Sequence, residues 1–223
     1  ADKNWKKTIQ RIGLTYNCEG QNRAQFADSL MSTANFTAIN QTMMNGVNQG
    51  VTIQTSTGLF KNALKINPNL SYGNKINFQQ IQKSYDPFTN STKIDTIQKP
   101  TMSHELNFNL SATTVLYAYY KFAGKKQARL RHLMTPNLGY RYTPGWNPLV
   151  TVNAGPNQSA ITYSPFERSI YSVGSTREAS LLTFGLNNTA EIKFKSAQDT
   201  VTGFKKIRLI DQFSVTGNYD FTK

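Results

Sequence analysis

The chain has 223 residues, of which 38% are hydrophobic, and its 25 lysines and arginines outnumber 12 acidic residues to give a net charge of +13. No apolar run approaches the roughly 18 residues of a membrane-spanning helix, which excludes a helical membrane protein. Composition leaves room for a membrane β-barrel, because only alternate residues of its strands face lipid.

Seven segments alternate apolar and polar residues with a period of two, which predicts β-strands with two different faces. The alternation is clearest in residues 129–146, where Leu130, Leu138 and Tyr140 stand between arginines and other polar residues. Most segments exceed the roughly five or six residues usual for a strand and reach the roughly nine to eleven that cross a bilayer. In chain order, the predicted strands cover residues 9–19, 47–57, 64–80, 104–120, 129–142, 179–195 and 209–221.

The connections between the predicted strands alternate in length, beginning with a long one. Long polar segments occupy residues 20–46, 84–103 and 143–177, and short turns join the other strands. In the third long segment, two apolar stretches flank residues 154–157 and predict a projecting hairpin. This alternation is typical of an outer-membrane barrel with long external loops and short periplasmic turns, whereas a soluble β-sandwich has no reason to show it.

Together these patterns predict an all-β fold, in which residues 1–223 are a portion of one transmembrane, antiparallel, up-and-down β-barrel in the cell outer membrane. Seven strands cannot close a bacterial barrel, because such barrels have an even number of strands and a free edge in lipid leaves backbone groups unsatisfied. We therefore expect a segment of a larger barrel, completed by more of the chain or by other chains. The first ten residues lack the apolar core of a signal peptide, which fits a mature product, a soluble protein or a piece of a longer chain.

Aromatic residues gather near the ends of two predicted strands. In a barrel they would form two girdles at the membrane interfaces, and in a soluble β-sandwich they would be ordinary core residues. The first group is Tyr117, Tyr119, Tyr120 and Phe122, and the second is Tyr140, Tyr142 and Trp146.

The polar faces of the predicted strands carry cations that would point into the barrel interior. Their charge suits the phosphates of a lipid head group, and the alternative is that they solvate a wet interior or meet a plug protein. Because the charge is scattered along the chain, an acidic glycolipid or a phosphate-rich membrane surface fits better than nucleic acid. The candidate contact residues are Arg11, Lys65, Lys75, Arg129, Arg131, Arg141, Lys193 and Lys195.

Two prolines, Pro68 and Pro136, stand in the middle of predicted strands. Each removes one hydrogen-bond donor from the ladder between neighbouring strands. Because both strands are expected to lie inside the sheet rather than at its edge, we predict a bulge or kink at each proline.

Sequence signatures of enzymes and of metal sites are missing. The two histidines, His104 and His132, lie far apart in the sequence, and no GxSxG, HExxH, P-loop or GxGxxG motif occurs. The single cysteine, Cys18, can form no disulfide within the chain, and no zinc-ligand spacing is present. We therefore predict no enzymatic activity, no metal and no cofactor.

Several local patterns resemble the LptD family, also called OstA, in its divergent form with a large barrel. This family assembles lipopolysaccharide (LPS) in the outer membrane. The patterns are RIGLTYNCEGQN at residues 11–22, INPNLSYG at 66–73, RHLMTPNLGYRYTP at 131–144, YSPFERSIY at 163–171, and FGLNNTAEIKFKS through DTVTGFKKIRLIDQFSVTGNYDF at 184–221.

The resemblance implies a large barrel that takes LPS from a periplasmic bridge and inserts it into the outer leaflet, with an LptE-like plug lipoprotein inside. The periplasmic jelly roll of the family and its partner cysteines are not in this sequence, so contact with the bridge proteins would need a domain not present here. Two alternatives stay open: another outer-membrane porin, transport or secretion barrel, and a soluble all-β extracellular binding module.

Overall fold

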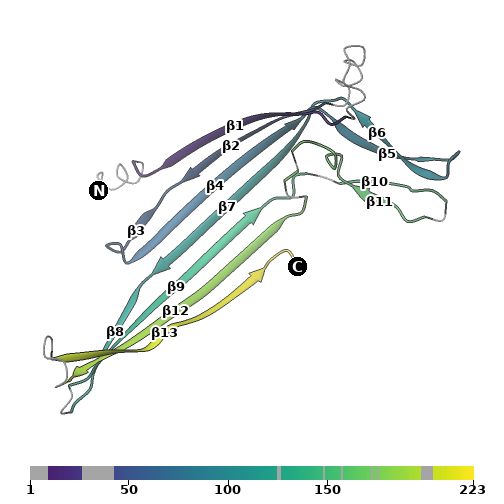
Figure 1. The fold of residues 1–223 in the computed structure, drawn as a ribbon. Helices are drawn as coiled ribbons and strands as arrows, with labels where there is room; N and C mark the ends of the chain where they lie inside the picture. The colour runs from purple at the N-terminus through teal and green to yellow at the C-terminus, as the bar shows by residue number, and fades with distance from the viewer. Residues whose placement is uncertain are drawn as a thin grey trace.

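The structure is a computed structural model, and it describes residues 10–26, 43–124, 127–147, 149–156, 158–171, 173–174, 176–196 and 203–223. In these residues all the regular secondary structure is β-strand (Figure 1). No helix in the described part is long and apolar enough to cross a membrane.

The main sheet is an antiparallel meander with the strand order β1-β2-β4-β7-β9-β12-β13, in which β3 also pairs with β4 and β8 with β9. The all-β antiparallel architecture is therefore confirmed. Within the described residues, β1 and β13 each pair on one side alone, so that the sheet is open and forms no closed barrel. The bounds are β1 (Gly13–Arg23), β2 (Met44–Gln54), β3 (Thr57–Leu59), β4 (Leu64–Asn77), β7 (Thr101–Thr114), β8 (Leu116–Lys121), β9 (Arg129–Thr143), β12 (Ala179–Lys195) and β13 (Phe204–Asp220).

Two small hairpins project from one end of the main sheet (Figure 1). The hairpin of β10 (Val150–Val152) and β11 (Ile161–Tyr163) lies where the sequence predicts one. The hairpin of β5 (Gln80–Asp86) and β6 (Ser91–Ile97) corrects the expectation of a plain loop at residues 84–103. Its strands are rich in polar residues, which hides the two-residue period from the sequence.

The turn between β5 and β6 has its own local cause. The carboxylate of Asp86 accepts hydrogen bonds from the backbone N–H of Phe88 at 2.9 Å and from the hydroxyl of Thr89 at 3.0 Å. These bonds lower the pKa of the Asp86 carboxyl below its ordinary value. An aspartate that bonds its own backbone two residues on is a standard way to close a turn, so this signal was available in the sequence.

The predicted strand bounds agree with the structure to different degrees. The strand expected at 179–195 coincides with β12, whereas β13 begins at Phe204 rather than at 209, because Phe204 already pairs with Lys195. The first strand runs later than expected, from Gly13 to Arg23, because its pairing with β2 continues to the pair Arg23 and Met44. Residues 27–42 of the first long connection lie outside the described residues.

The two prolines explain why two expected strands are each divided in the structure. The ladder stops after Gln54 and Asn69 and resumes at Thr57 and Ile66, so the strand expected at 47–57 becomes β2 and β3 opposite Pro68. Proline has no N–H, and here only its carbonyl bonds across, accepting from the N–H of Thr55 at 3.2 Å.

Pro136 has the same effect two sheet positions further on, in β9. Pairing with β9 stops at Thr113 and resumes at Leu116, which divides the strand expected at 104–120 into β7 and β8. The register is the same on both sides of each interruption, so each proline breaks the ladder without inserting a bulge. Both prolines lie in interior strands, as expected.

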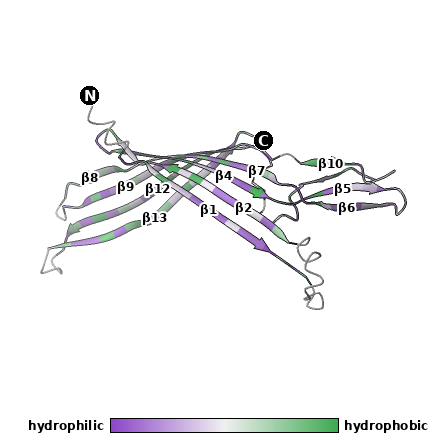
Figure 2. Ribbon diagram, turned by 90° about the horizontal axis from the view of Figure 1, so that it is seen from above, coloured by the Kyte–Doolittle hydropathy of each residue, from purple (hydrophilic) through white to green (hydrophobic). Residues whose placement is uncertain are grey.

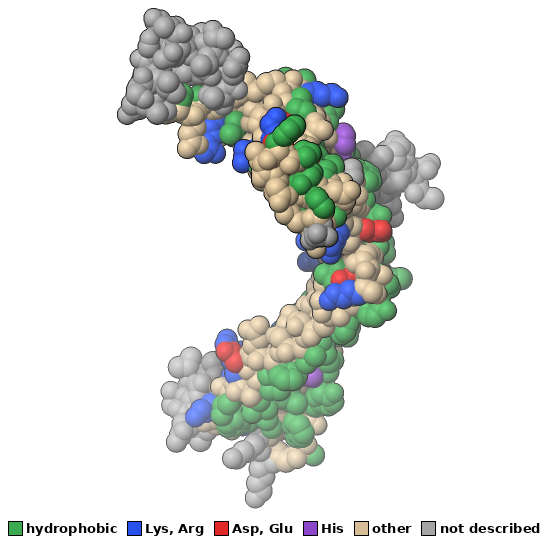
Figure 3. Space-filling model, turned by 90° about the vertical axis from the view of Figure 1, so that its right-hand side faces the viewer, with side chains coloured by type: hydrophobic (Ala, Val, Ile, Leu, Met, Phe, Trp, Pro, Cys, Tyr) green, Lys and Arg blue, Asp and Glu red, His purple; other side chains and the backbone are tan. Residues whose placement is uncertain are grey.

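The two faces of the sheet differ in chemistry, because neighbouring strands align apolar residues with apolar residues. Leu138, for example, lies opposite Ala112 on β7 and Phe184 on β12. Figure 2 shows hydrophilic and hydrophobic residues alternating along the strands. In Figure 3 the sheet is curved, with hydrophobic side chains along its convex side and polar and charged ones along its concave side.

The convex, apolar face is exposed rather than packed against a core. Leu138 and Phe184 are each 50% exposed. Of the buried hydrophobic residues in the described part, Ala190 alone belongs to the main sheet, and the others lie in the hairpins and the segment after them: Ile81, Ala154, Tyr163 and Phe166. The described residues therefore form a curved wall and not the compact core of a soluble β-sandwich.

Candidate site on the polar face

The eight predicted contact cations do not form one site. Arg11 precedes β1 and lines a pocket of about 340 Å³ together with Pro68, and Lys65 lies on β4 opposite Thr113. Lys75 and Arg141 lie toward the end of the sheet that carries the hairpins. The remaining four gather at the opposite end, where short turns join the strands: Arg129, Arg131, Lys193 and Lys195.

Near the hairpin end, a chain of polar contacts crosses three strands of the polar face. Lys75 on β4 forms an ion pair with Glu105 on β7 at 3.5 Å. Glu105 accepts a hydrogen bond from the amide of Asn107 at 3.0 Å, and the oxygen of that amide accepts one from Arg141 on β9 at 3.4 Å. Lys75 and Arg141 are therefore already engaged in holding the sheet together.

A segment of the last long connection, residues 164–171, folds back over this end of the polar face, and we call it the strap. The amide of Asn77 donates to the carbonyl of Tyr171 at 3.2 Å and accepts from its N–H at 3.1 Å. The Tyr171 hydroxyl reaches the carbonyl of Glu19 on β1 at 3.3 Å. Together with Lys75 and Glu105, strap residues line a pocket of about 960 Å³. The strap thus ties the long connection between β9 and β12 to strands β1 and β4.

The strap is also anchored to the β5–β6 hairpin. The N–H of Ile81 donates to the carbonyl of Pro165 at 2.8 Å, and the N–H of Lys83 donates to the hydroxyl of Tyr163, the last residue of β11 directly before the strap, at 3.0 Å. The ammonium group of Lys83 forms an ion pair with Glu167 at 2.7 Å. Ile81, Tyr163 and Phe166 are buried in this region, so that strap and hairpins form one packed unit.

The ion pair between Lys83 and Glu167 predicts a pH dependence of this unit. The hydrogen bond from Lys83 lowers the pKa of the Glu167 carboxyl, so the stabilisation is present above the ordinary glutamate pKa and is lost as the pH falls through the lowered value. We expect a carboxyl NMR titration to give Glu167 a pKa below the ordinary value of about 4.3, and Lys83→Met to raise it. A pKa at or above about 4.3 in the unmodified protein would contradict the ion pair.

At the short-turn end, four cations lie side by side across four strands. Lys121 on β8 is opposite Arg129 on β9, Arg129 is opposite Lys193 on β12, and Lys193 is opposite Lys206 on β13. Directly opposed residues of an antiparallel pair share a face and approach to about 5 Å between their Cβ atoms. None of these four cations forms an ion pair within the described residues. We call this set the cation row.

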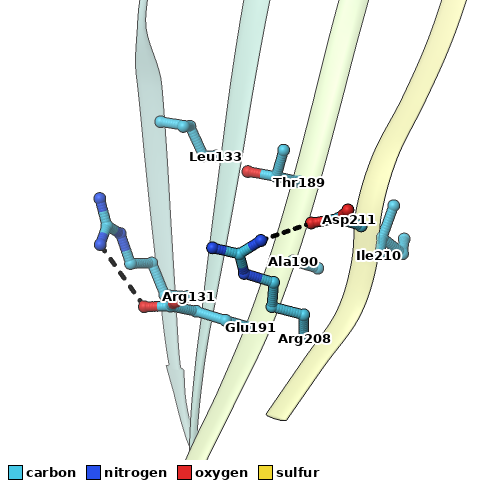
Figure 4. A pocket seen from close by; sticks show the side chains of 8 residues that line it. All are labelled: Arg131, Leu133, Thr189, Ala190, Glu191, Arg208, Ile210 and Asp211. Atoms are coloured by element: carbon cyan, nitrogen blue, oxygen red, sulfur yellow. Dashed lines mark hydrogen bonds and ion pairs between the residues drawn. The ribbon is translucent and has the colours of Figure 1, made fainter. Parts of the chain in front are cut away.

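The next row toward the centre of the sheet carries both signs of charge (Figure 4). Arg131 forms an ion pair with Glu191 at 3.4 Å, and Glu191 lies opposite Arg208 on β13. Arg208 forms a second ion pair with Asp211 at 2.8 Å. These residues line a pocket of about 270 Å³, and Figure 4 shows both guanidinium groups on the same side of the strands.

The pocket lies at an irregularity of β13. Asn188, Ala190 and Glu191 of β12 lie opposite Phe213, Ile210 and Arg208, so that β13 carries two more residues than β12 between the same points. The two register shifts bring Asp211 beside Arg208, which a regular strand would leave further apart. Bulges of this kind locally re-aim side chains.

Tyr117 and Tyr119 lie on the polar face, whereas the girdle expected at this turn would need them on the lipid-facing apolar face. Tyr119 is opposite Arg131, and the guanidinium of Arg131 lies 5.5 Å from the centre of the Tyr117 ring. The two tyrosine rings stack with 6.3 Å between their centres. The strand period already held this information, because both residues are an even number of positions from Lys121.

Several residues of this end of the polar face were missed in the sequence. That Lys121 and Arg129 share a face can be predicted only when the turn between their strands is known. The faces of Lys206 and Arg208 cannot be predicted from the rest of β13 because two register shifts interrupt its period. No group of three or more histidine, cysteine or acidic residues in the described part is placed to hold a metal ion.

The described residues thus define a class of structure: an open antiparallel wall with an exposed apolar face and a charged polar face, the arrangement from which transmembrane β-barrels are built. Searches of curated proteins and of solved structures each return no match. The family model described as LptD protein matches residues 1–223, and the chain belongs to the LptD family. That family acts in LPS transport and assembly, is an outer-membrane family, and is not a family of enzymes.

Proposed function

We propose that this chain is part of the wall of an outer-membrane barrel that receives LPS from the periplasm and inserts it into the outer leaflet. Family membership together with the exposed apolar face carries this proposal. A large exposed apolar surface is unfavourable in water and is matched by the acyl chains of a bilayer. The polar face then lines the barrel interior, and β1 and β13 pair with further strands of the barrel.

In this arrangement the cations of the polar face meet the anionic groups of the substrate. Arginine suits phosphate because its planar guanidinium donates two parallel hydrogen bonds. The cations without a carboxylate partner in the described residues are the better candidates, which favours Arg11, Lys65, Arg129, Lys193 and Lys195 over Lys75 and Arg131.

The proposed partners follow from the same assignment. An LptE-like plug lipoprotein would face the polar side of the wall, outer-membrane lipid would face the apolar side, and periplasmic bridge proteins would deliver LPS through a domain not present in this sequence. The hairpins and the strap would then lie at the external mouth, because they occupy the end of the sheet with the long connections.

Replacing Arg129, Arg131 and Arg141 together by alanine tests the interior contact. We expect less LPS at the cell surface and a more permeable outer membrane, because three guanidinium groups are removed from the path of an anionic substrate. Barrel insertion, followed by heat-dependent mobility in gels, is expected to be unchanged, because none of the three lies on the apolar face. An unchanged permeability in this strain would count against LPS contact with these residues.

A further inference from the structure

The short-turn end of the polar face carries more positive charge than its own carboxylates balance. The cation row and the row beside it hold six cations, Lys121, Arg129, Arg131, Lys193, Lys206 and Arg208, against two carboxylates, Glu191 and Asp211, which leaves four positive charges. Like charges directly opposite each other destabilise a sheet. The fold therefore holds these cations together at a cost that an anionic ligand would offset.

Beside the charge lies an aromatic surface. Tyr117 and Tyr119 are 54% and 67% exposed, and their rings are nearly parallel, with 7° between their planes. The guanidinium of Arg131 lies over the ring of Tyr117, 5.5 Å from its centre, which favours this arrangement of the two groups. Flat, exposed tyrosine rings with hydroxyl groups at their edges are suited to stacking against sugar rings.

We propose that the cation row and the Tyr117–Tyr119 pair form a binding site for a phosphorylated sugar head group. The cations would bind the phosphate, and the stacked tyrosines would hold the sugar ring next to it. An acidic polypeptide would also balance the charge, but it would leave the exposed tyrosine rings without a matching partner. This site rests on the proposed function, which places LPS on the polar face, and it locates the first contact at the short-turn end.

The pocket next to the site fits this role. Arg131 and Arg208 line its walls, each already paired with a carboxylate, so that the pocket adds hydrogen-bond donors without adding to the charge surplus. The cation row, in contrast, has no carboxylate partner in the described residues. We therefore assign the phosphate to the row and the sugar hydroxyls to the pocket.

The test uses the full-length protein purified in detergent, with the row neutralised by Lys121→Gln, Arg129→Gln, Lys193→Gln and Lys206→Gln. The probes are purified LPS, the same LPS after removal of its phosphates, inorganic phosphate and polyglutamate. We expect neutralisation to weaken LPS binding at least tenfold and to make binding less sensitive to salt. Folding should be retained, because the substitution removes repulsion between neighbouring cations.

A control variant removes the same number of positive charges away from the polar-face site, at Lys61, Lys93, Lys99 and Lys223, and is expected to bind LPS like the unmodified protein. A second variant, Tyr117→Ala with Tyr119→Ala, is expected to weaken binding of LPS but not of inorganic phosphate. In the unmodified protein, dephosphorylated LPS should bind at least tenfold more weakly than LPS.

The alternatives give different results. Equal loss of affinity in the row and control variants would show that only net charge matters and would overturn the site. Competition by inorganic phosphate as strong as that by LPS would identify a simple anion site, and equal competition by polyglutamate an acidic protein partner; either would overturn the sugar assignment. The proposed function fails separately, if depletion of the protein leaves surface LPS unchanged.

Discussion

Replacing Asn77 by alanine is expected to release the strap from the polar face. The Asn77 side chain is fully buried, and its amide bonds both the N–H and the carbonyl of Tyr171. Alanine would leave those two backbone groups without partners. Each group that stays buried then costs about 1–3 kcal/mol of stability. We expect the free energy for local opening of the strap to fall by that order, measured by hydrogen exchange at the Tyr171 amide.

Asn67 supplies the matched control on the same strand. Its side chain is half-buried, in contrast to the fully buried Asn77, and makes one hydrogen bond of 3.4 Å to Ser111, so Asn67→Ala is expected to cost about 1 kcal/mol or less. If Asn77→Ala left exchange at Tyr171 as slow as in the unmodified protein, the strap would be held mainly by its contacts with the hairpins.

An arginine in place of Leu110 is expected to have the other large effect. Leu110 lies on the apolar face, near the middle of the stretch formed by the consecutive strands β7 and β8. It is opposite Pro68 and Tyr140 and is 36% exposed. If this face meets lipid, an arginine near the bilayer midplane costs about 2–4 kcal/mol. The free energy of unfolding of the full-length protein from lipid vesicles in urea would measure the loss.

The adjacent position gives the comparison. Ser111 is exposed on the polar face, so Ser111→Arg is expected to cost about 0.5 kcal/mol or less. The two residues are neighbours in one strand and receive the same substitution. The difference between their costs therefore reports the effect of the sheet face and not the effect of position along the strand. Equal costs at Leu110 and Ser111 would mean that the apolar face does not contact lipid.

The order and direction of the strands could be predicted because one local rule, the two-residue period, governs the whole sheet. That rule places β12 at residues 179–195 and assigns Leu138 and Arg131 to opposite faces. The same rule assigns Tyr117 to the polar face, and its expected place in a girdle is wrong because the clustering of aromatic residues alone does not indicate which face of a strand they occupy.

Other features depend on contacts between distant parts of the chain. The bond between Asn77 and Tyr171 joins residues 94 positions apart, and nothing local to either residue indicates it. The interruption caused by Pro68 appears in its neighbour, between β2 and β3, and not in its own strand. The cation row depends on a turn and on two register shifts in β13, so its members could not be grouped from the sequence.

The unpaired edges of the sheet, on β1 and β13, also affect how residues 1–223 behave when they are prepared by themselves. β1 offers a row of free peptide groups along 11 residues and β13 along 17, next to an apolar surface. Long, flat, exposed strands recruit identical strands from other molecules and stack into fibrils. We therefore expect residues 1–223, produced by themselves, to aggregate in water, and the proposed barrel to form only when they are refolded together with its other strands.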